Sequence, residues 1–426
     1  MTKLTTILAG LAAVVMSFSV SCKKDRAKEN AQQRTQKPAL KNAETKVPPT
    51  PATLDSDAAL RAAQACVEAS NAHDLDKLLA CYAKDIRMVM LDWVGPKMPT
   101  HGHDALKANM TAYWAGFPDA HETPQILIAN GNQVAMLTLE TGTNSGETMG
   151  MKPTGQKVSL FGADLMTLNL DGTVAKRIHL GDQSTFAHQL GRYKSERSPS
   201  SENPFDSVVI AAAKTGDLAV ARNVSIVESF IEAMDTGNIA AVKAHSAQTI
   251  SFRYIPQNQP IAGVDEYMKS LAMWKSMYKS RNRTIREIFG AGDWVVVHSS
   301  YTGIIGMDIP GAKVKTTGKP VKMNTIEFFE VADTLIKAHW VVENAYAWAV
   351  QAGIVDPPTA VKDTRDLAPA KGAIKKANEA LKNAEKAAAS AGKTTNRAIH
   401  EAEKATNRVS KDAKRATKVL RNVTPE

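Results

Sequence analysis

The sequence contains an internal repeat, and this repeat limits the fold more than any other feature. Turn residues recur about 162 residues apart, at Gly102 and Gly263, Gly131 and Gly292, and Thr154-Gly155 and Thr317-Gly318. Because glycine suits positions that need positive φ or close approach, these shared turns predict one fold present twice. The copies end differently, at Asp182 in the first and Asn344 in the second. The two copies therefore need not share a chemistry.

The N-terminus has the pattern of an export signal. An apolar run over residues 4–20 follows Lys3 and ends in Ser19-Val20-Ser21-Cys22. Its short length and sharp boundary predict a signal peptide over residues 1–21. The small residues before Cys22 resemble a bacterial lipobox, although Ser19 stands where an aliphatic residue is usual. We expect Cys22 to carry the lipid of an exported lipoprotein; ordinary cleavage nearby and an uncleaved helix are the alternatives.

Residues 22–56 are polar and rich in Lys, Gln, Asn, Ala and Pro. Such a segment cannot bury enough apolar surface to offset the cost of ordering, so we expect a disordered tether. A lipid on Cys22 would then hold the folded part near a membrane. The predicted localisation is the bacterial cell envelope, in the periplasm or at the cell surface.

Two further cysteines, Cys66 and Cys81, flank the turn at residues 71–74. They lie in two short helical patterns that would run antiparallel. In an oxidising compartment such a pair forms a disulfide, and in a packed core it forms two buried thiols. The sequence leaves both interpretations open.

Each copy has helical patterns first and strand patterns afterwards. Domain 1 is expected over residues 57–195, and domain 2 over 222–356 after a linker at 196–221. The expected helices are 57–70, 75–82 and 104–114, then 226–234, 239–244 and 264–279; the expected strands are 125–129, 133–143, 157–168 and 174–180, then 284–289, 294–302, 319–331 and 334–342. This order predicts the α+β class, with helices on one face of a curved antiparallel or mixed sheet.

The turns of copy one carry a resemblance to a known family. Phe117-Pro118-Asp119, the segment 142–147, Pro153-Thr154-Gly155, Asp171-Gly172 and the closing Asp182 with Gln189-Leu190-Gly191 resemble the SnoaL-like polyketide cyclase and ester cyclase family, within the nuclear transport factor 2-like superfamily. Copy two resembles it less. The resemblance implies two cone-shaped α+β barrels, each with a pocket between sheet and helices. Family members often pair through their sheets, so the two copies are expected to form a pseudo-dimer within the chain.

Asp182 is the first candidate for chemistry. In the last strand of copy one, Ile178 and Leu180 alternate onto the side of Asp182, while Arg177 and His179 lie on the other side. Burial would raise the pKa of a carboxyl there and suit it to acid–base work. The resemblance implies the same role, since cyclases of this family use an aspartate at this place. The alternative is that Asp182 is the N-cap of the next helix.

Asp164 is the second candidate, and Glu327 stands at the same place in copy two. An acid present in both copies favours a structural partner for Arg or Lys, although two carboxyls in one pocket can also divide acid and base roles. No zinc pattern and no phosphate or dinucleotide motif is present. We therefore expect neither a metal nor a cofactor.

Several side chains are expected to line the pockets. In copy one these are Trp93, Tyr113, Trp114, Phe117, Ile178 and Asn144, the last where ester cyclases often carry histidine; in copy two they are Trp340 and Asn344. Aromatic rings of this kind suit an apolar ligand, and core packing is the alternative for each.

The C-terminal residues 357–426 are rich in Ala and Lys. Residues 361–426 hold sixteen Lys and Arg against eight Asp and Glu, so most of the net charge of +10 lies here. The pattern predicts a basic helix that contacts anionic lipid, a cell-wall polymer or a helical partner through a weak coiled-coil seam. Nucleic acid is disfavoured for an exported protein.

These features favour an envelope-anchored tandem protein that binds a small apolar ligand or acts as a binding or assembly module. The alternative is a cyclase-, isomerase- or hydrolase-type enzyme in domain 1 with Asp182 as general acid and base. The substituted positions Asn144 and Asn344 favour the first interpretation.

Overall fold

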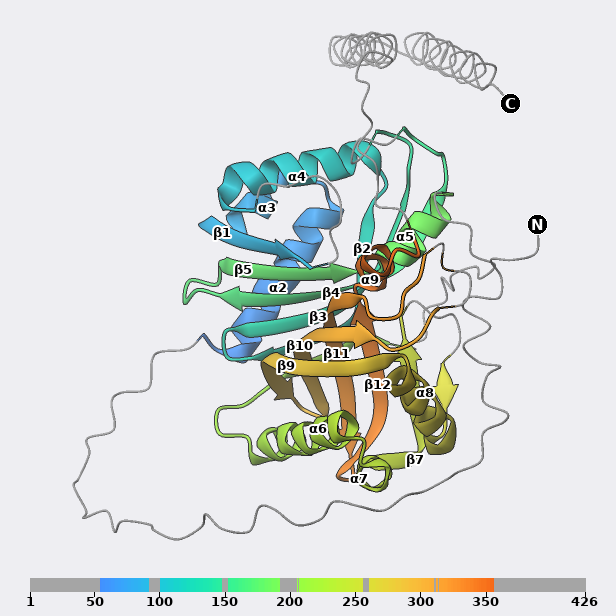
Figure 1. Ribbon diagram of the computed structural model, residues 1–426. Helices are drawn as coiled ribbons and strands as arrows, with labels where there is room; N and C mark the ends of the chain where they lie inside the picture. The colour runs from blue at the N-terminus through green and yellow to red at the C-terminus, as the bar shows by residue number, and fades with distance from the viewer. Residues whose placement is uncertain are drawn as a thin grey trace, which may run out of the picture. The chain divides into compact units, whose positions relative to one another are not determined.

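The computed structural model describes residues 54–91, 100–147, 152–191, 205, 207–255, 260–309, 312 and 314–355 (Figure 1). All of these residues lie in one compact unit that ends at Pro358. The expected signal peptide, Cys22, Trp93 and the basic tail lie outside the described residues. Within the described residues, no helix is long and apolar enough to cross a membrane.

Repeat one consists of helices packed on a mixed sheet. Its elements are α2 (Ser56–Asn71), α3 (Leu75–Ala80), β1 (Tyr82–Met90), α4 (Gly102–Gly116), β2 (His121–Asn130), β3 (Gln133–Thr143), β4 (Lys157–Leu168), β5 (Val174–Gly181), α5 (Gln183–Gln189) and β6 (Val209–Ala212). The strand order is β1-β5-β4-β3-β2-β6. The β2–β3 hairpin turns at Gly131, whose φ of 59° is a conformation that glycine adopts without strain.

Repeat two has the same order of elements, apart from the added strand β8 and the lack of a counterpart to β6. They are α6 (Leu218–Thr236), α7 (Ile239–His245), β7 (Ser246–Tyr254), β8 (Ile261–Ala262), α8 (Val264–Ser276), β9 (Tyr278–Ala291), β10 (Trp294–Ile305), β11 (Pro320–Ala332), β12 (Leu335–Glu343) and α9 (Ala345–Ala352). The strand order is β8-β7-β12-β11-β10-β9. The expected α+β class with two tandem domains is confirmed.

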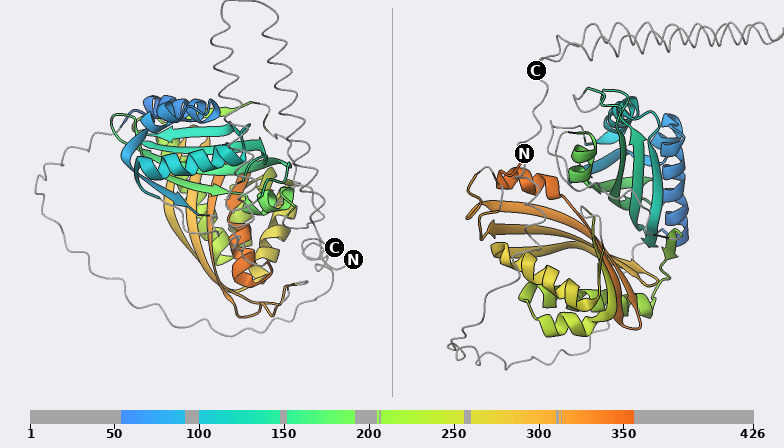
Figure 2. Two further views of the ribbon diagram at one scale, coloured as in Figure 1. Left: turned by 90° about the horizontal axis from the view of Figure 1, so that it is seen from above. Right: turned by 90° about the vertical axis from the view of Figure 1, so that its right-hand side faces the viewer.

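The two sheets pack against each other, and the helices cover their other faces (Figure 2). One hydrophobic cluster contains side chains of both sheets, among them Phe161 and Leu180 of repeat one and Phe328 and Trp340 of repeat two. Each repeat has its own cluster under its helices. Each sheet therefore has two buried faces, one toward its helices and one toward the other repeat.

Polar contacts also join the repeats. Lys176 Nζ lies 2.7 Å from Glu287 Oε1, and Asn130 Nδ2 donates to the carbonyl of Gly290 at 2.9 Å. Asn344 Nδ2 donates to the carbonyl of Leu91 at 3.2 Å. The expected pocket residue Asn344 therefore links the two repeats.

Four strands were not predicted: β1, β6, β7 and the two-residue β8. β1 and β7 pair in parallel with β5 and β12, and β6 pairs in parallel with β2. Their partners are distant in the chain, so no local turn marks them. Tyr82 was expected in a helix and instead begins β1, and residues 209–212 of the expected linker form β6 in the sheet of repeat one.

Candidate functional site

The two faces of β5 carry different kinds of side chain. Ile178 and Leu180 belong to the cluster between the sheets, whereas Arg177 lines a cavity under the helices together with residues of α2. The predicted alternation along this strand is confirmed. However, its apolar face packs against repeat two, so the interpretation of Ile178 as a pocket residue is wrong. The interior of repeat one lies on the side of Arg177 and His179.

The side chain of Asp182 accepts hydrogen bonds at the start of α5. It is only 2% exposed, and its Oδ1 accepts from Ser184 Oγ at 2.6 Å and from Thr185 N at 3.0 Å. The hydroxyl of Thr185 donates to Oδ2. Burial raises the pKa of Asp182, and the hydrogen bonds from Ser184 and Thr185 oppose that rise. This geometry is that of an N-cap, the alternative that the sequence left open.

Asp164 forms a buried ion pair with Arg177. The guanidinium Nε and Nη2 lie 2.7 and 2.9 Å from the two carboxylate oxygens, and His179 Nδ1 lies 3.1 Å from Oδ1. Burial alone would raise the pKa of Asp164, but Arg177 and His179 outweigh it and hold the pKa well below its usual range. The basic partner expected from the sequence is Arg177, and a bidentate pair of this kind fixes geometry.

Glu140 of β3 is a third acid in the same interior. Burial, with the negative charges of Glu122 and Asp164, raises its pKa to about 7, against the opposing effects of His179 and Arg177. Within the described residues, its carboxyl has no hydrogen-bond or ion-pair partner. A carboxyl with a pKa near neutrality and no fixed partner is available for proton exchange or ligand binding.

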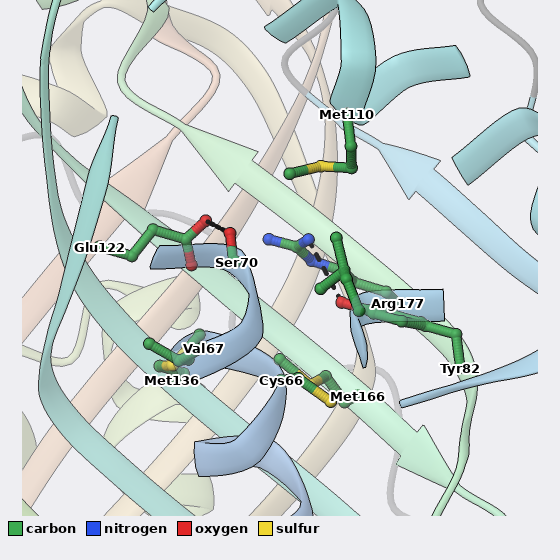
Figure 3. A pocket seen from close by; sticks show the side chains of 10 residues that line it. Cys66, Val67, Ser70, Tyr82, Met110, Glu122, Met136, Met166 and Arg177 are labelled. Atoms are coloured by element: carbon green, nitrogen blue, oxygen red, sulfur yellow. Dashed lines mark hydrogen bonds between the residues drawn. The ribbon is translucent and has the colours of Figure 1, made fainter. Parts of the chain in front are cut away.

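A cavity lies between α2, α4 and the sheet of repeat one (Figure 3). Its lining residues are Cys66, Val67, Ser70, Leu78, Tyr82, Met110, Glu122, Met136, Met166 and Arg177. Figure 3 shows Glu122, which accepts a hydrogen bond from Ser70 at 3.3 Å, across the cavity from the guanidinium of Arg177. The volume of about 10 Å³ is the room of roughly one water molecule.

Repeat two replaces this arrangement with a closed network. Glu327, at the register position of Asp164, accepts from Arg283 at 3.1 Å, Tyr301 at 3.2 Å and Thr325 at 2.7 Å, and His339 lies 3.0 Å away. Burial would raise the pKa of Glu327, but these partners hold it well below its usual range. A buried carboxylate with this many donors acts as a structural centre.

Repeat two also buries a second acid. Glu343 of β12 is 5% exposed and accepts a hydrogen bond from the hydroxyl of Tyr254 at 3.1 Å. Burial raises the pKa of Glu343 to about 7, against the effects of Arg281 and Tyr254. Unlike Glu140, this acid already has a fixed partner.

The other expected pocket residues lie elsewhere. Tyr113 and Phe117 pack in a small core with Phe186, and Trp114 stacks on His73 at 4.9 Å. Trp340 stacks on Phe205 at 4.5 Å between the repeats. None of these side chains lines the described cavity, because the aromatic rings fill the local cores instead. The core-packing alternative applies to them.

The side chain of Asn144 forms hydrogen bonds within a loop. Its side-chain oxygen accepts from Thr154 N at 2.9 Å and Thr154 Oγ1 at 3.0 Å, and its amide donates to the carbonyl of Gly146 at 3.0 Å. The side chain is fully buried, so it takes no part in the described cavity. Its hydrogen bonds give it a structural role.

Cys66 and Cys81 are free thiols in the structure. The sulfur of Cys66 lies 4.0 Å from the carbonyl oxygen of Cys81, and Cys66 lines the cavity. Of the two interpretations that the sequence left open, this state is that of two thiols and not that of a disulfide. Among the described residues, no group of His, Cys, Asp and Glu side chains has the arrangement of a metal site.

Sequence reasoning missed Glu140, Arg177 and Glu122 as site residues. A signal for Glu140 was present, because it is charged and lies within the strand expected at 133–143. It is on the same face as Met136 and Thr138, which are fully buried. Only the fold showed that this face is the helix-covered interior.

The architecture and the interior acids define the class of protein: a tandem of cone-shaped α+β domains, each with ionisable side chains under its helices. The sequence matches the SnoaL-like polyketide cyclase family over residues 59–190 and 224–352. This match spans both repeats and more than half of the chain. The chain belongs to the SnoaL-like polyketide cyclase family.

Solved structures similar to the chain include AclR from Streptomyces galilaeus, with 23% identity over 33% of this chain and 89% of that one, at a TM-score of 0.30. IdmH from Streptomyces antibioticus has 26% identity over 31% of this chain and 98% of its own, at 0.29. A SnoaL-like protein from Jannaschia sp. CCS1 has 18% identity over 35% of this chain and 99% of its own, at 0.30. No curated protein sequence matches the chain.

Proposed function

We propose that the protein is an envelope-anchored binding module whose first repeat takes up a small apolar ligand. The observation that supports this is the cavity of repeat one, which is walled by Met110, Met136 and Met166 and which Asp182 does not line. At its present volume of about 10 Å³ the cavity takes no more than a water. Methionine side chains are unbranched and adaptable, so they can move aside for a larger ligand.

Repeat two is assigned an assembly role. Its central carboxylate is satisfied by four side chains, and its sheet buries one face of repeat one. A tandem of this kind supplies within one chain the sheet partner that a single domain would otherwise need. The two repeats would then act as an intra-chain pseudo-dimer.

The anchoring part of the proposal concerns segments outside the described residues. Lipidated Cys22 would place the protein at a bacterial envelope membrane, and the basic tail would contact anionic lipid, a cell-wall polymer or a helical partner. If Cys22 carries the lipid, a Cys22→Ala variant moves from the membrane fraction to the soluble fraction. Unchanged membrane association of that variant would refute the lipid anchor.

A cyclase-, isomerase- or hydrolase-type enzyme that uses Asp182 is the weaker proposal. Family membership supports the reaction class. Against it, the carboxylate of Asp182 is occupied by Ser184 and Thr185, and a general acid needs access to its substrate.

Ligand binding is tested by native mass spectrometry of the full-length protein and of Met110→Trp, which fills the cavity from the half-buried side of α4. The control is Thr111→Trp, an exposed position on the same helix. The proposal expects a bound small organic molecule in the parent and the control, and its loss from Met110→Trp. A parent without bound mass, or equal loading of all three proteins, would contradict it.

A further inference from the structure

His298 of β10 is a buried histidine at the contact between the two sheets, which Figure 2 shows packed against each other. Its side chain is 6% exposed. Side chains alternate along a strand, so it lies on the same face as Trp294 and Val296, which belong to the cluster between the sheets. Its register partner on β11, Ile326, belongs to the same cluster. The imidazole therefore lies in the layer where the two repeats meet.

Neither ring nitrogen of His298 has a hydrogen-bond partner within the described residues. The buried imidazole of His339 is different, because it lies 3.0 Å from the carboxylate of Glu327 and 2.8 Å from the hydroxyl of Tyr267. A neutral imidazole carries one donor and one acceptor, and burying both without partners costs free energy. The polar atoms of His298 therefore do not serve the packing of the fold.

Repeat one shows that an apolar side chain fits at this place. The strand registers put Leu137 of repeat one at the position of His298, and Ile126 at the position of Glu287. Leu137 and Ile126 pair with each other across β2 and β3, are fully buried and belong to the cluster between the sheets. The contact layer is thus apolar at the repeat-one position and ionisable at the repeat-two position.

An ion pair between the repeats lies beside His298. Glu287 of β9 is the register partner of His298, and Lys176 Nζ of β5 lies 2.7 Å from Oε1 of the same carboxylate. Arg286 of β9 donates from Nε to the hydroxyl of Ser300 at 2.8 Å. The charged groups that act on His298 are therefore Glu287 and Arg286 of its own sheet and Lys176 of the opposite repeat.

The neutral form of His298 is favoured at this place. Burial lowers the pKa of His298; Glu287 raises it, and Lys176 and Arg286 lower it further. Because Glu287 is already bound by Lys176, an imidazolium here would share one carboxylate with a second cation. A proton on His298 therefore puts an incompletely balanced charge into the contact layer.

We propose that His298 is a pH switch in the contact between the repeats: when it takes up a proton from water, the added charge beside Lys176 loosens the two sheets from each other. This inference goes beyond the proposed function, because it depends on no ligand. The pKa of His298 in the folded protein lies below its ordinary value of 6.5. Its contribution to the contact is therefore complete above pH 6.5 and is lost as pH falls through the folded value.

Hydrogen exchange of the full-length protein, followed by mass spectrometry at about pH 7.5 and about pH 5.5, tests the switch. Each exchange rate is divided by that of an unstructured amide at the same pH, which gives a protection factor. His298→Leu copies repeat one and His298→Gln keeps a polar side chain, but neither variant takes up a proton at this position. Since Glu140 and Glu343 also titrate in this range, each variant is compared with the parent at the same pH.

The expected result is a variant-to-parent ratio of protection in β5 and β10 that is roughly fivefold higher at about pH 5.5 than at about pH 7.5, for both variants alike. Helix α3 packs through Leu78 in the core under the helices of repeat one, so its ratio should be the same at both pH values. The control His121→Leu replaces an exposed histidine of β2 and should keep the parent's protection throughout.

Three outcomes would overturn the inference. The ratio does not change with pH; it changes for His298→Leu but not for His298→Gln, as packing alone would produce; or it changes equally in α3 and in the contact strands, as a loss of stability of the whole fold would produce. Circular dichroism establishes that each variant is folded. If His298→Leu does not fold, His298→Gln alone decides between these results.

Discussion

Asp182 and Glu140 of repeat one both have raised pKa values, but their surroundings differ. Asp182 is held by three donors from Ser184 and Thr185, whereas Glu140 has none within the described residues. A carboxylate that caps a helix contributes to stability, and a carboxyl without partners costs stability when it ionises. Of these two acids, Glu140 is therefore the one available for proton exchange or ligand binding.

The raised pKa of Glu140 predicts a pH-dependent stability. Its folded value of about 7 lies above the ordinary value of 4.5, so the stabilisation is complete below pH 4.5 and is lost as pH rises through 7. The side chain of Glu140→Gln cannot ionise, so the variant does not lose stability in this way. Urea unfolding should find the variant more stable than the parent by roughly 1–3 kcal/mol at about pH 8, and similar to it at about pH 5.

The control for that measurement is Glu147→Gln, since Glu147 is exposed. Its stability should follow the parent across the whole pH range. If Glu140→Gln also followed the parent, the acid would be solvated and not held in the interior.

Removal of the Asp182 cap should lower stability. Asp182→Ala leaves the Thr185 amide and two hydroxyl groups without their acceptor, so we expect a loss of about 2–3 kcal/mol in the free energy of unfolding. The exposed cap Asp55, which accepts from Ala58 N at 3.2 Å, is the matched control, and Asp55→Ala should cost about 1 kcal/mol. A smaller loss at Asp182 than at Asp55 would contradict the structural role.

The sequence predicted the positions and roles of these residues only in part. Alternation along residues 174–182 placed Arg177 and His179 opposite Ile178, as the structure has them. Alternation cannot say which face of a strand is the interior, because here both faces are buried. Asp182 therefore seemed to face a pocket, and Glu140 was not considered.

At the scale of elements, both repeats pair a buried carboxylate of a central strand, Asp164 of β4 or Glu327 of β11, with an arginine of another strand. In repeat one the cation comes from β5, as Arg177; in repeat two it comes from β9, as Arg283. Arg177 lies on the strand next to that of Asp164, whereas Arg283 reaches Glu327 from the strand beyond β10. Such pairs fix strand positions, while their net contribution to stability depends on the cost of desolvation.

Removing Arg177 from its ion pair with Asp164 should lower the free energy of unfolding. Arg177→Met leaves the charge of Asp164 buried, with only His179 beside it, so we expect a loss of about 3–5 kcal/mol at neutral pH. The double variant Arg177→Met/Asp164→Leu removes both charges and should recover most of that loss. Urea unfolding of Arg177→Met, of Asp164→Leu and of the double variant measures the coupling free energy between the two side chains. Additive losses would show that the pair does not act as a unit.

The helices and long strands were predictable from local patterns, but β1, β6, β7 and β8 were not. The helix expected at 57–70 and the hairpin at residues 130–132 have strong local signals, namely an apolar period and Asn-Gly. By contrast, β1 is fixed by its parallel pairing with β5, about ninety residues away in the chain. Non-local pairing of this kind leaves no mark in a short window of sequence.

At the scale of the whole described unit, the interface between the sheets couples the two repeats. Trp340 lies at its centre, with Phe205 at 4.5 Å, Phe161 at 6.4 Å and the guanidinium of Arg253 at 5.0 Å from its ring. Loss of this ring would leave a cavity that touches both sheets. The stability of one repeat therefore depends on the other.

Trp340→Ala should lower protection from hydrogen exchange in β4 of repeat one as well as in β11 and β12. The expected loss is about 3–5 kcal/mol. The control is Trp274→Ala on α8, where the indole packs on Tyr254 within repeat two. Its effect should stay within that repeat. Unchanged protection of β4 in Trp340→Ala would mean that the repeats are energetically independent.

The sequence predicted the tandem arrangement from its turn glycines. It could not show where the pocket lies, because the cavity walls come from α2, α3, α4 and five strands that meet only in the fold. Trp340 illustrates the limit: an aromatic residue near a strand end suits both a pocket and an interface. Only the packing of the second sheet distinguishes the two.

The most direct test of the account is a pH titration by NMR of the full-length protein with ¹³C-labelled Asp and Glu carboxyl groups. Glu140→Gln, Glu343→Gln and Asp182→Asn assign the three buried acids. We predict that the Glu140 signal titrates at about 7, above its ordinary value of 4.5, and that this signal is lost in Glu140→Gln. A Glu140 signal that titrates near 4.5 would contradict the account.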